Sequence, residues 1–323
     1  MPVANPPRRR KALLIGIREV KNVFASMEVP GAHRDTKRFC DLLLKTYKYQ
    51  SEDIVTLTDN PEVPDEDRER LWPTRDNIIR GMKNLVRDAR PGDILVLLFS
   101  GHGGQVKALN DPNEKDGLDE ILFAADSYRQ PSNVDIPFAN YVKDDEIKEI
   151  FTTLCAGCRC VMIFDCCHSG TAADLPEVTE GDLTHVLQAP APSKSSGFAK
   201  MQTIHPTSAA ASTGLSENSF ELDGSDKLAL PSPVPELSSW SACKDAHNTT
   251  GNSKGGVFLR AFCQALQKNP TPTHATLLQN LQKEIEVIMD RVPPERKERL
   301  SDWPIPQLGS LRPHAVLETP FVL

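Results

Sequence analysis

One segment, Asp93 to Ser100 (DILVLLFS), constrains the fold of this chain more than any other. It contains the longest strictly apolar run, Ile94 to Phe99, which is far too short to cross a membrane. A strand that is apolar on both faces is typical of a parallel sheet covered by helices on both sides. Two further runs have the same character, Ala12 to Ile17 and Cys160 to Phe164. We therefore expect three buried strands.

Amphipathic segments alternate with these runs. Helical spacing of apolar residues predicts helices over Thr36–Tyr47, from a Thr74 cap to Val86, and over Asp145–Leu154, Gly256–Leu266 and Leu277–Met289. Two shorter runs, Ile54–Leu57 and Leu237–Cys243, are interpreted as further strands. The alternation predicts an α/β fold, a three-layer sandwich whose mostly parallel central sheet has helices on both faces.

The composition argues against several classes of protein. The 323 residues include 37 basic and 44 acidic side chains, a formal charge of −7, so neither a nucleic-acid nor a membrane partner is expected. No secretory signal is recognised, and the eight cysteines follow no secreted disulfide framework, which favours the cytoplasm. The basic run Arg8 to Lys11 is compatible with a nuclear localisation signal, although a solvated basic arm is the simpler interpretation.

The periodic patterns fail between about Leu187 and Glu236, where Ala, Ser, Pro and Thr dominate. Such a long stretch inside a compact domain is usually functional or disordered. We therefore divide the chain into a basic arm (1–10), a first folded region (11–186), a linker (187–236) and a C-terminal region (237–323). The two folded regions are expected to form a single domain.

Polar clusters follow two of the apolar strands. The first strand, DILVLLF, is followed by Ser100-Gly101-His102-Gly103-Gly104, and the second, CVMIF, by Asp165-Cys166-Cys167-His168-Ser169-Gly170. Ligands of doubly wound sheets bind beyond the carboxyl ends of the strands. A nearby imidazole lowers the pKa of a thiol, and free backbone N–H groups bind an oxyanion. We therefore expect a Cys–His dyad rather than two structural side chains.

These clusters resemble the active-site motifs of the metacaspases, the caspase-like cysteine peptidases of fungi, plants and protists. The resemblance extends from Lys11 to about Leu266 and is closest to the type I group, with a p20-like region (11–186) before a p10-like region (237–323). It implies a caspase-like fold and a monomeric cysteine endopeptidase.

The resemblance also implies roles for single residues. Cys167 corresponds to the nucleophile and His102 to the residue that handles protons. The backbone N–H groups of Gly103 and Cys167 would form the oxyanion hole. Cys166 is interpreted as a packed neighbour, and His168 as a residue of local structural importance.

Three residues match the specificity pocket of the family, namely Asp35 in the segment GAHRD, Ser100 and Asp165. Two carboxylates in a cleft favour a guanidinium or ammonium, so protein or peptide substrates with Arg or Lys at P1 are expected. Taken singly, Asp35 is equally well explained as a carboxylate at a helix N-terminus and Asp165 as a strand cap. The caspase motif Q-A-C-[RQG]-G is absent, which argues against cleavage after Asp.

Further acidic residues correspond to positions through which type I metacaspases bind activating calcium. They are Asp119, Asp144, Asp145 and Asp174. Carboxylate clusters suit a hard cation such as calcium. The alternatives are a helix cap for Asp144 and Asp145 and a turn for Asp119.

An enzyme that cuts after Lys or Arg will also cut its own accessible chain. The linker offers Lys200, Lys194 and Lys227 as sites of autoprocessing, and Lys200 is favoured because Phe198 and Met201 flank it.

Two other functions stay open. One is a non-proteolytic scaffold in aggregate handling, against which the intact His102 and Cys167 count. The other is a metal-bound thiol sensor built on the cluster from Cys155 to Cys167. A structural zinc site needs about four ligands, and no second CxxC pair or His pair follows at suitable spacing. Packing is therefore the favoured role of Cys155, Cys158 and Cys160.

Overall fold

The structure is a computed structural model that describes residues 8–24, 28–108, 117–130, 136–166, 173, 175–176, 234–242, 251–252, 255–293, 304–312 and 316–323. Within these ranges, every helix is too short or too polar to cross a membrane.

A six-stranded sheet lies at the centre of the molecule, in the order β11-β8-β7-β3-β1-β2. Its strands are β1 (Arg10–Gly16), β2 (Ile54–Thr58), β3 (Ile94–Ser100), β7 (Arg159–Asp165), β8 (Glu236–Ser241) and β11 (Gln307–Ser310). Neighbouring strands are parallel except β11, which is antiparallel to β8. Every residue of β3 is buried, because both faces of the sheet are covered. The prediction of a mostly parallel central sheet is confirmed.

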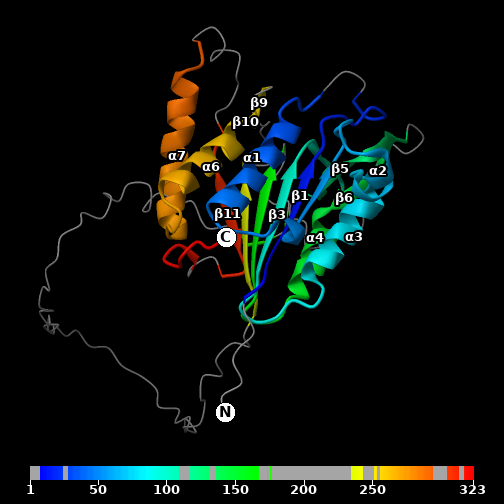
Figure 1. Ribbon diagram of the computed structural model, residues 1–323. Coiled ribbons are helices and arrows are strands. Elements are labelled where there is room, and N and C mark those ends of the chain that lie inside the picture. Colours follow the sequence, from blue (N-terminus) through cyan, green and yellow to red (C-terminus); the bar gives the residue numbers. More distant parts are fainter. Residues whose placement is uncertain are drawn as a thin grey trace, which may run out of the picture.

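Helices cover both faces of this sheet, as predicted (Figure 1). One face carries α1 (Ala32–Lys45), α6 (Val257–Lys268) and α7 (His274–Asp290), and the other carries α3 (Arg75–Val86) and α4 (Asp144–Thr152). The Thr74 side chain caps α3 by accepting the N–H of Asn77, as expected. Helix α7 begins at His274, before the predicted Leu277, because Thr273 caps it by accepting the N–H of Thr276.

A second sheet beside the first was not predicted. It contains β4 (Gly103–Lys107), β5 (Leu118–Arg129) and β6 (Phe138–Lys143), paired antiparallel in the order β4-β5-β6. Neither β4 nor β6 has a clear apolar run, since most of their residues are only half buried. Shorter elements are α2 (Asp65–Leu71), the 3-10 turn Ser51–Asp53, and the hairpin of β9 (Gly251–Asn252) and β10 (Gly255–Gly256).

The register of the parallel strands determines which side chains meet at their carboxyl ends. Ser100, the last residue of β3, lies opposite Asp165, the last residue of β7, and opposite Gly16 of β1. The N–H of Gly101 donates to the carbonyl oxygen of Asp165 at 3.4 Å. The polar clusters that follow β3 and β7 therefore begin side by side at one edge of the sheet. In Figure 1 the arrowheads of these strands point to the end at which β9 and β10 lie.

Candidate active site

The first predicted catalytic residue, His102, lies between the end of β3 and the start of β4. Its side chain is buried, with 9% of its surface exposed. The ring of Phe24, in the loop after β1, lies against the imidazole with ring centroids 4.4 Å apart, and it also contacts Phe123 edge-on at 5.2 Å. The carbonyl oxygen of His102 accepts the N–H of Phe123 at 3.0 Å. The side sheet and the loop after β1 therefore fix the position of this imidazole.

The second predicted cluster begins at the end of β7. Asp165 and Cys166 are buried there, which agrees with the interpretation of Cys166 as a packed neighbour. The predicted nucleophile Cys167 and the following His168 lie outside the described residues, as does Asp174. Cys166, which directly precedes Cys167 in the sequence, lies at the same sheet edge as the His102 loop.

The three predicted pocket residues converge at this edge. Asp35, from the first turn of α1, is 1% exposed, and its Oδ2 lies 3.4 Å from the hydroxyl of Ser100. The N–H of Gly256 donates to the same oxygen at 2.9 Å, and Arg38 contacts Oδ1 at 3.0 Å. Asp165 accepts the N–H of Leu259 at 3.2 Å. Asp35 of α1 and Asp165 of β7 thus form one acidic pair. Ser100 of β3 lies beside Asp35, and the N-terminal end of α6 covers the pair.

Burial makes this pair reluctant to ionise. Burial raises the pKa of Asp35 to about 6, although the Gly256 N–H and the charge of Arg38 oppose the rise. Burial and the neighbouring Asp35 raise the pKa of Asp165 to about 8, against the effect of the Leu259 N–H. Two carboxylates that share a dry site cannot both be charged without a cation. The pair therefore fits a guanidinium or ammonium placed between its oxygens.

Sequence reasoning missed two glycines that pack against this acidic pair. A Cβ atom on Gly255 would overlap the carboxylate of Asp35, and one on Gly256 would overlap that of Asp165. Gly255 also has φ +109, a conformation that side chains rarely adopt. The only signal in the sequence was the Gly-Gly pair directly before α6, and the bond from Gly256 to Asp35 spans 221 positions of the chain.

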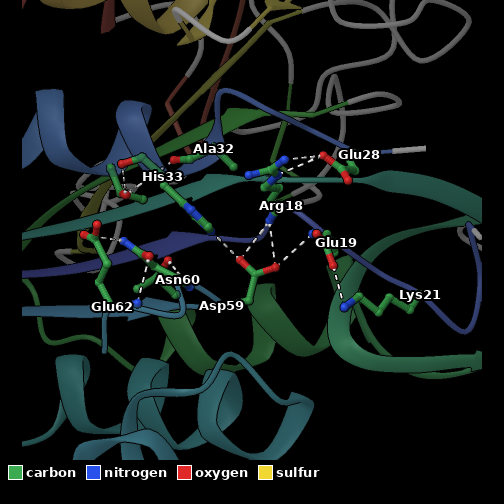
Figure 2. Close-up of polar contacts among 11 residues, drawn as sticks. Arg18, Glu19, Lys21, Glu28, Ala32, His33, Asp59, Asn60 and Glu62 are labelled. Carbon is green, nitrogen blue, oxygen red and sulfur yellow. Dashed lines mark hydrogen bonds and ion pairs between the residues drawn. The ribbon is translucent and has the colours of Figure 1, made fainter. Parts of the chain in front are cut away.

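The loop before α1 is fixed by an aspartate that the sequence analysis also missed. Figure 2 shows the carboxylate of Asp59, which follows β2, between Arg18, Glu19 and His33. It accepts the backbone N–H groups of Arg18 and Glu19 at 2.8–3.1 Å and contacts His33 Nε2 at 2.6 Å. Asp59 therefore ties the loop that carries Phe24 to the first turn of the helix that carries Asp35.

Three of the four residues predicted to bind calcium lie together beside the side sheet. Carboxylate oxygens of Asp119, Asp144 and Asp145 lie within 4.8 Å of one another, and Asp119 and Asp144 are buried. Lys143 forms an ion pair with Asp119. Oxygen donors from several carboxylates are the set that a hard cation prefers, so these residues fit calcium. Asp144 and Asp145 also open α4, so the alternative role near a helix N-terminus applies at the same time.

The chain was compared with protein families and with solved structures. Residues 10–176 match the metacaspase, peptidase C14 domain family. Metacaspase-1 of Sclerotinia sclerotiorum is 36% identical over 299 residues, which cover 87% of this chain and 64% of that protein. Metacaspase-1 of Ajellomyces capsulatus is 34% identical, and the match covers 87% of this chain and 78% of the relative. Caspase-1 of Spodoptera frugiperda shares the fold, with a TM-score of 0.53, 13% identity and coverage of 100% and 95% of the two chains.

These similarities agree with one another. The likeness to the insect caspase confirms the predicted caspase-like fold. The chain spans 64% of the length of Metacaspase-1 of Sclerotinia sclerotiorum and of Metacaspase-1B of Neurospora crassa. The family match covers β3 and the following His102, β7 with its last residue Asp165, and the segment of Asp35. This chain belongs to the metacaspase family.

Proposed function

We propose that this protein is a calcium-dependent cysteine endopeptidase that cleaves proteins after Arg or Lys. The observation that carries the proposal is the buried pair of Asp35 and Asp165, at the same carboxyl edge of the sheet that the His102 loop follows. A buried acidic pair is costly for a fold unless a cationic ligand uses it. Substrates would be proteins or peptides that present a basic P1 side chain.

The proposed catalytic roles belong to the residues that match the family's active-site motifs. The Cys167 thiolate attacks the scissile carbonyl carbon, and His102 accepts the thiol proton and gives it to the leaving amine. The N–H groups of Gly103 and Cys167 donate to the oxyanion that forms. Water then hydrolyses the acyl-enzyme, with His102 accepting its proton as the C–S bond breaks. Contact with the Phe24 ring holds the imidazole in one orientation during both proton transfers.

The pocket would select its substrate by charge and geometry. A P1 guanidinium forms paired hydrogen bonds with a carboxylate, and an ammonium interacts as a point charge. Binding of either cation lowers the pKa values of Asp35 and Asp165 and releases the proton that the pair holds near neutral pH. A P1 Asp would instead add a third carboxylate to the site.

Calcium would be held by Asp119, Asp144 and Asp145, together with Asp174. The ion supplies positive charge that neutralises carboxylates which otherwise repel one another. Asp119 belongs to β5, which pairs with β4 directly after His102. Filling of the cluster would therefore stabilise the side sheet against which His102 rests.

We also propose autoprocessing in the linker, at Lys200 before Lys194 or Lys227. These lysines lie outside the described residues. Addition of calcium to purified protein should yield new N-termini after one or more of them, readable by mass spectrometry. Equal processing of Cys167→Ala would show that another protease makes the cut.

The experiment that tests the proposed function is a peptide assay. Matched peptides with Arg, Lys or Asp at P1 are offered to the wild-type protein and to Cys167→Ala, with calcium and with excess chelator. We expect cleavage after Arg and Lys by the wild type in calcium alone. Cleavage after Asp, or activity that survives in Cys167→Ala, would contradict the proposal. Absence of any cleavage would favour the non-proteolytic scaffold.

A further inference from the structure

A cysteine pair lies far from the active site, in the turn that joins α4 to β7. The Sγ atoms of Cys155 and Cys158 are 2.9 Å apart. The N–H of Cys158 donates to the carbonyl oxygen of Cys155 at 3.1 Å, and Gly157 has φ +81, so the backbone forms a tight turn. This turn places both thiols on the same side. It precedes β7, whereas the candidate active site follows the other end of that strand.

The surroundings hold this turn in place. The thiol of Cys158 donates to the carbonyl oxygen of Arg90 at 3.1 Å, and that of Cys155 lies 3.5 Å from the carbonyl oxygen of Ala89. The N–H of Gly92 donates to the carbonyl oxygen of Gly157 at 2.8 Å. Cys158 is buried, whereas Cys155 is half exposed. Cys155 is thus the more accessible of the two residues, and Cys158 lies next to it in the interior.

We propose that Cys155 and Cys158 form a redox-active dithiol that closes to an intramolecular disulfide by exchange with glutathione disulfide. The Cys155 thiolate attacks one sulfur of glutathione disulfide and releases one glutathione. The Cys158 thiolate then attacks Sγ of Cys155 and releases the second glutathione, so two protein thiols are oxidised and one glutathione disulfide is reduced. The sulfurs need to approach by only about 0.9 Å to reach bonding distance.

The order in which the two cysteines react follows from the difference in their burial. Burial raises the pKa of the Cys158 thiol to about 12, so Cys155 supplies the first nucleophile. Cys158 lies beside Cys155, so the second step is intramolecular. This proximity compensates for the small fraction of Cys158 that is present as thiolate.

A metal site is the other use of clustered thiols, and the described residues do not support it. Among them, the group of His, Cys, Asp and Glu side chains that converges within ligand distance is Asp119, Asp144 and Asp145, not the cysteines. Cys160 is fully buried in β7. Two thiols without further ligands suit disulfide exchange better than zinc.

The test uses full-length Cys167→Ala, which lacks the proposed catalytic thiol and does not process itself. The folded protein is equilibrated with mixtures that run from reduced glutathione alone to glutathione disulfide alone, then acid-quenched, alkylated and digested with trypsin. Cleavage after Lys148 and Arg159 yields a peptide that contains Cys155 and Cys158 but not Cys160. We expect this peptide to resist alkylation and to lose about 2 Da, the mass of two hydrogens, as the oxidised fraction rises.

Three further variants sharpen the experiment. Cys158→Ser should stop at a mixed disulfide of Cys155 with glutathione, Cys155→Ser should stay alkylatable, and Cys160→Ser should close like its parent. Full alkylation of both cysteines in glutathione disulfide alone would overturn the proposal. A stable mixed disulfide in the parent, or a disulfide to another cysteine, would overturn it as well. None of these outcomes depends on peptidase activity.

Discussion

Two acidic clusters lie near the carboxyl edge of the sheet and are built differently. Asp35 and Asp165 are embedded between the main sheet and the N-terminal end of α6, where backbone N–H groups of Gly256 and Leu259 contact them. Asp119, Asp144 and Asp145 lie where β5 of the side sheet meets the start of α4.

The two clusters also differ in charge. In the first, burial dominates, and the pKa of both carboxyl groups is raised. In the second, burial lowers the pKa of Lys143, but its hydrogen bond and ion pair with Asp119 outweigh this and raise it above the ordinary value. In each cluster one carboxylate already contacts a cation, Arg38 at Asp35 and Lys143 at Asp119. We expect the first cluster to release a proton when an organic cation binds, and Lys143 to be displaced when a metal ion binds the second. We therefore expect the surroundings, rather than the residue type, to determine which positive charge each cluster binds.

The largest expected effect is on the first cluster. Asp35→Asn or Asp165→Asn should weaken transition-state binding of an Arg substrate by on the order of 2–5 kcal/mol, because one partner of a buried charge pair is lost. The measurement is kcat/KM with an Arg peptide in saturating calcium. Asp41→Asn, on the exposed side of the same helix, should be unchanged. If Asp35→Asn and Asp165→Asn weakened only calcium binding, the two clusters would not have the separate roles proposed.

Stability should fall as the first cluster ionises. Between about pH 4 and 8 the native state binds more protons than the unfolded state, because the pKa values of Asp35 and Asp165 are raised. The free energy of unfolding should therefore decrease as pH rises through this window, by several kcal/mol. Urea titrations of calcium-free protein at pH 5 and pH 8 measure this. In Asp165→Asn, the free energy of unfolding should fall less between pH 5 and pH 8 than in the wild type. An equal fall in that variant would contradict the raised pKa of Asp165.

The tight contact with α6 predicts a steric effect. Gly256→Ala should destabilise the protein by about 1–3 kcal/mol, because the added methyl group overlaps the Asp165 carboxylate. The backbone at Gly256 (φ −59, ψ 144) is one that Ala adopts freely, so strain is not the cause. Adding Asp165→Ala to Gly256→Ala should cost less than the two substitutions do separately. Strict additivity of the two free energies would show that the methyl group is accommodated elsewhere.

The smallest expected effect concerns the second cluster. Lys143→Gln should tighten calcium binding about fivefold, because it removes the ammonium that competes for Asp119. Isothermal titration of the calcium-free protein measures this, and Lys83→Gln on the surface of α3 serves as the control for lost charge. Weaker binding by Lys143→Gln would mean that the lysine organises the cluster instead of competing for it.

The features that could be predicted from the sequence are those that depend on short segments of the chain. Ser100 and Asp165 end buried strands, and a parallel sheet brings such ends together, so their neighbourhood followed from the pattern. The side sheet was missed because half-buried strands such as β4 lack an apolar run. Gly256, Asp59 and Phe24 were missed because their roles arise only from contacts with distant segments.

The central claim is that Asp35 and Asp165 recognise the positive charge of the P1 side chain. The most direct measurement compares two peptides that differ only in Arg or citrulline at P1, since citrulline keeps the shape of Arg without its charge. With the wild-type protein in calcium, we expect kcat/KM to fall by at least about 100-fold for citrulline, and the double variant Asp35→Asn/Asp165→Asn to lose most of this discrimination. Equal cleavage of both peptides by the wild type would contradict the account.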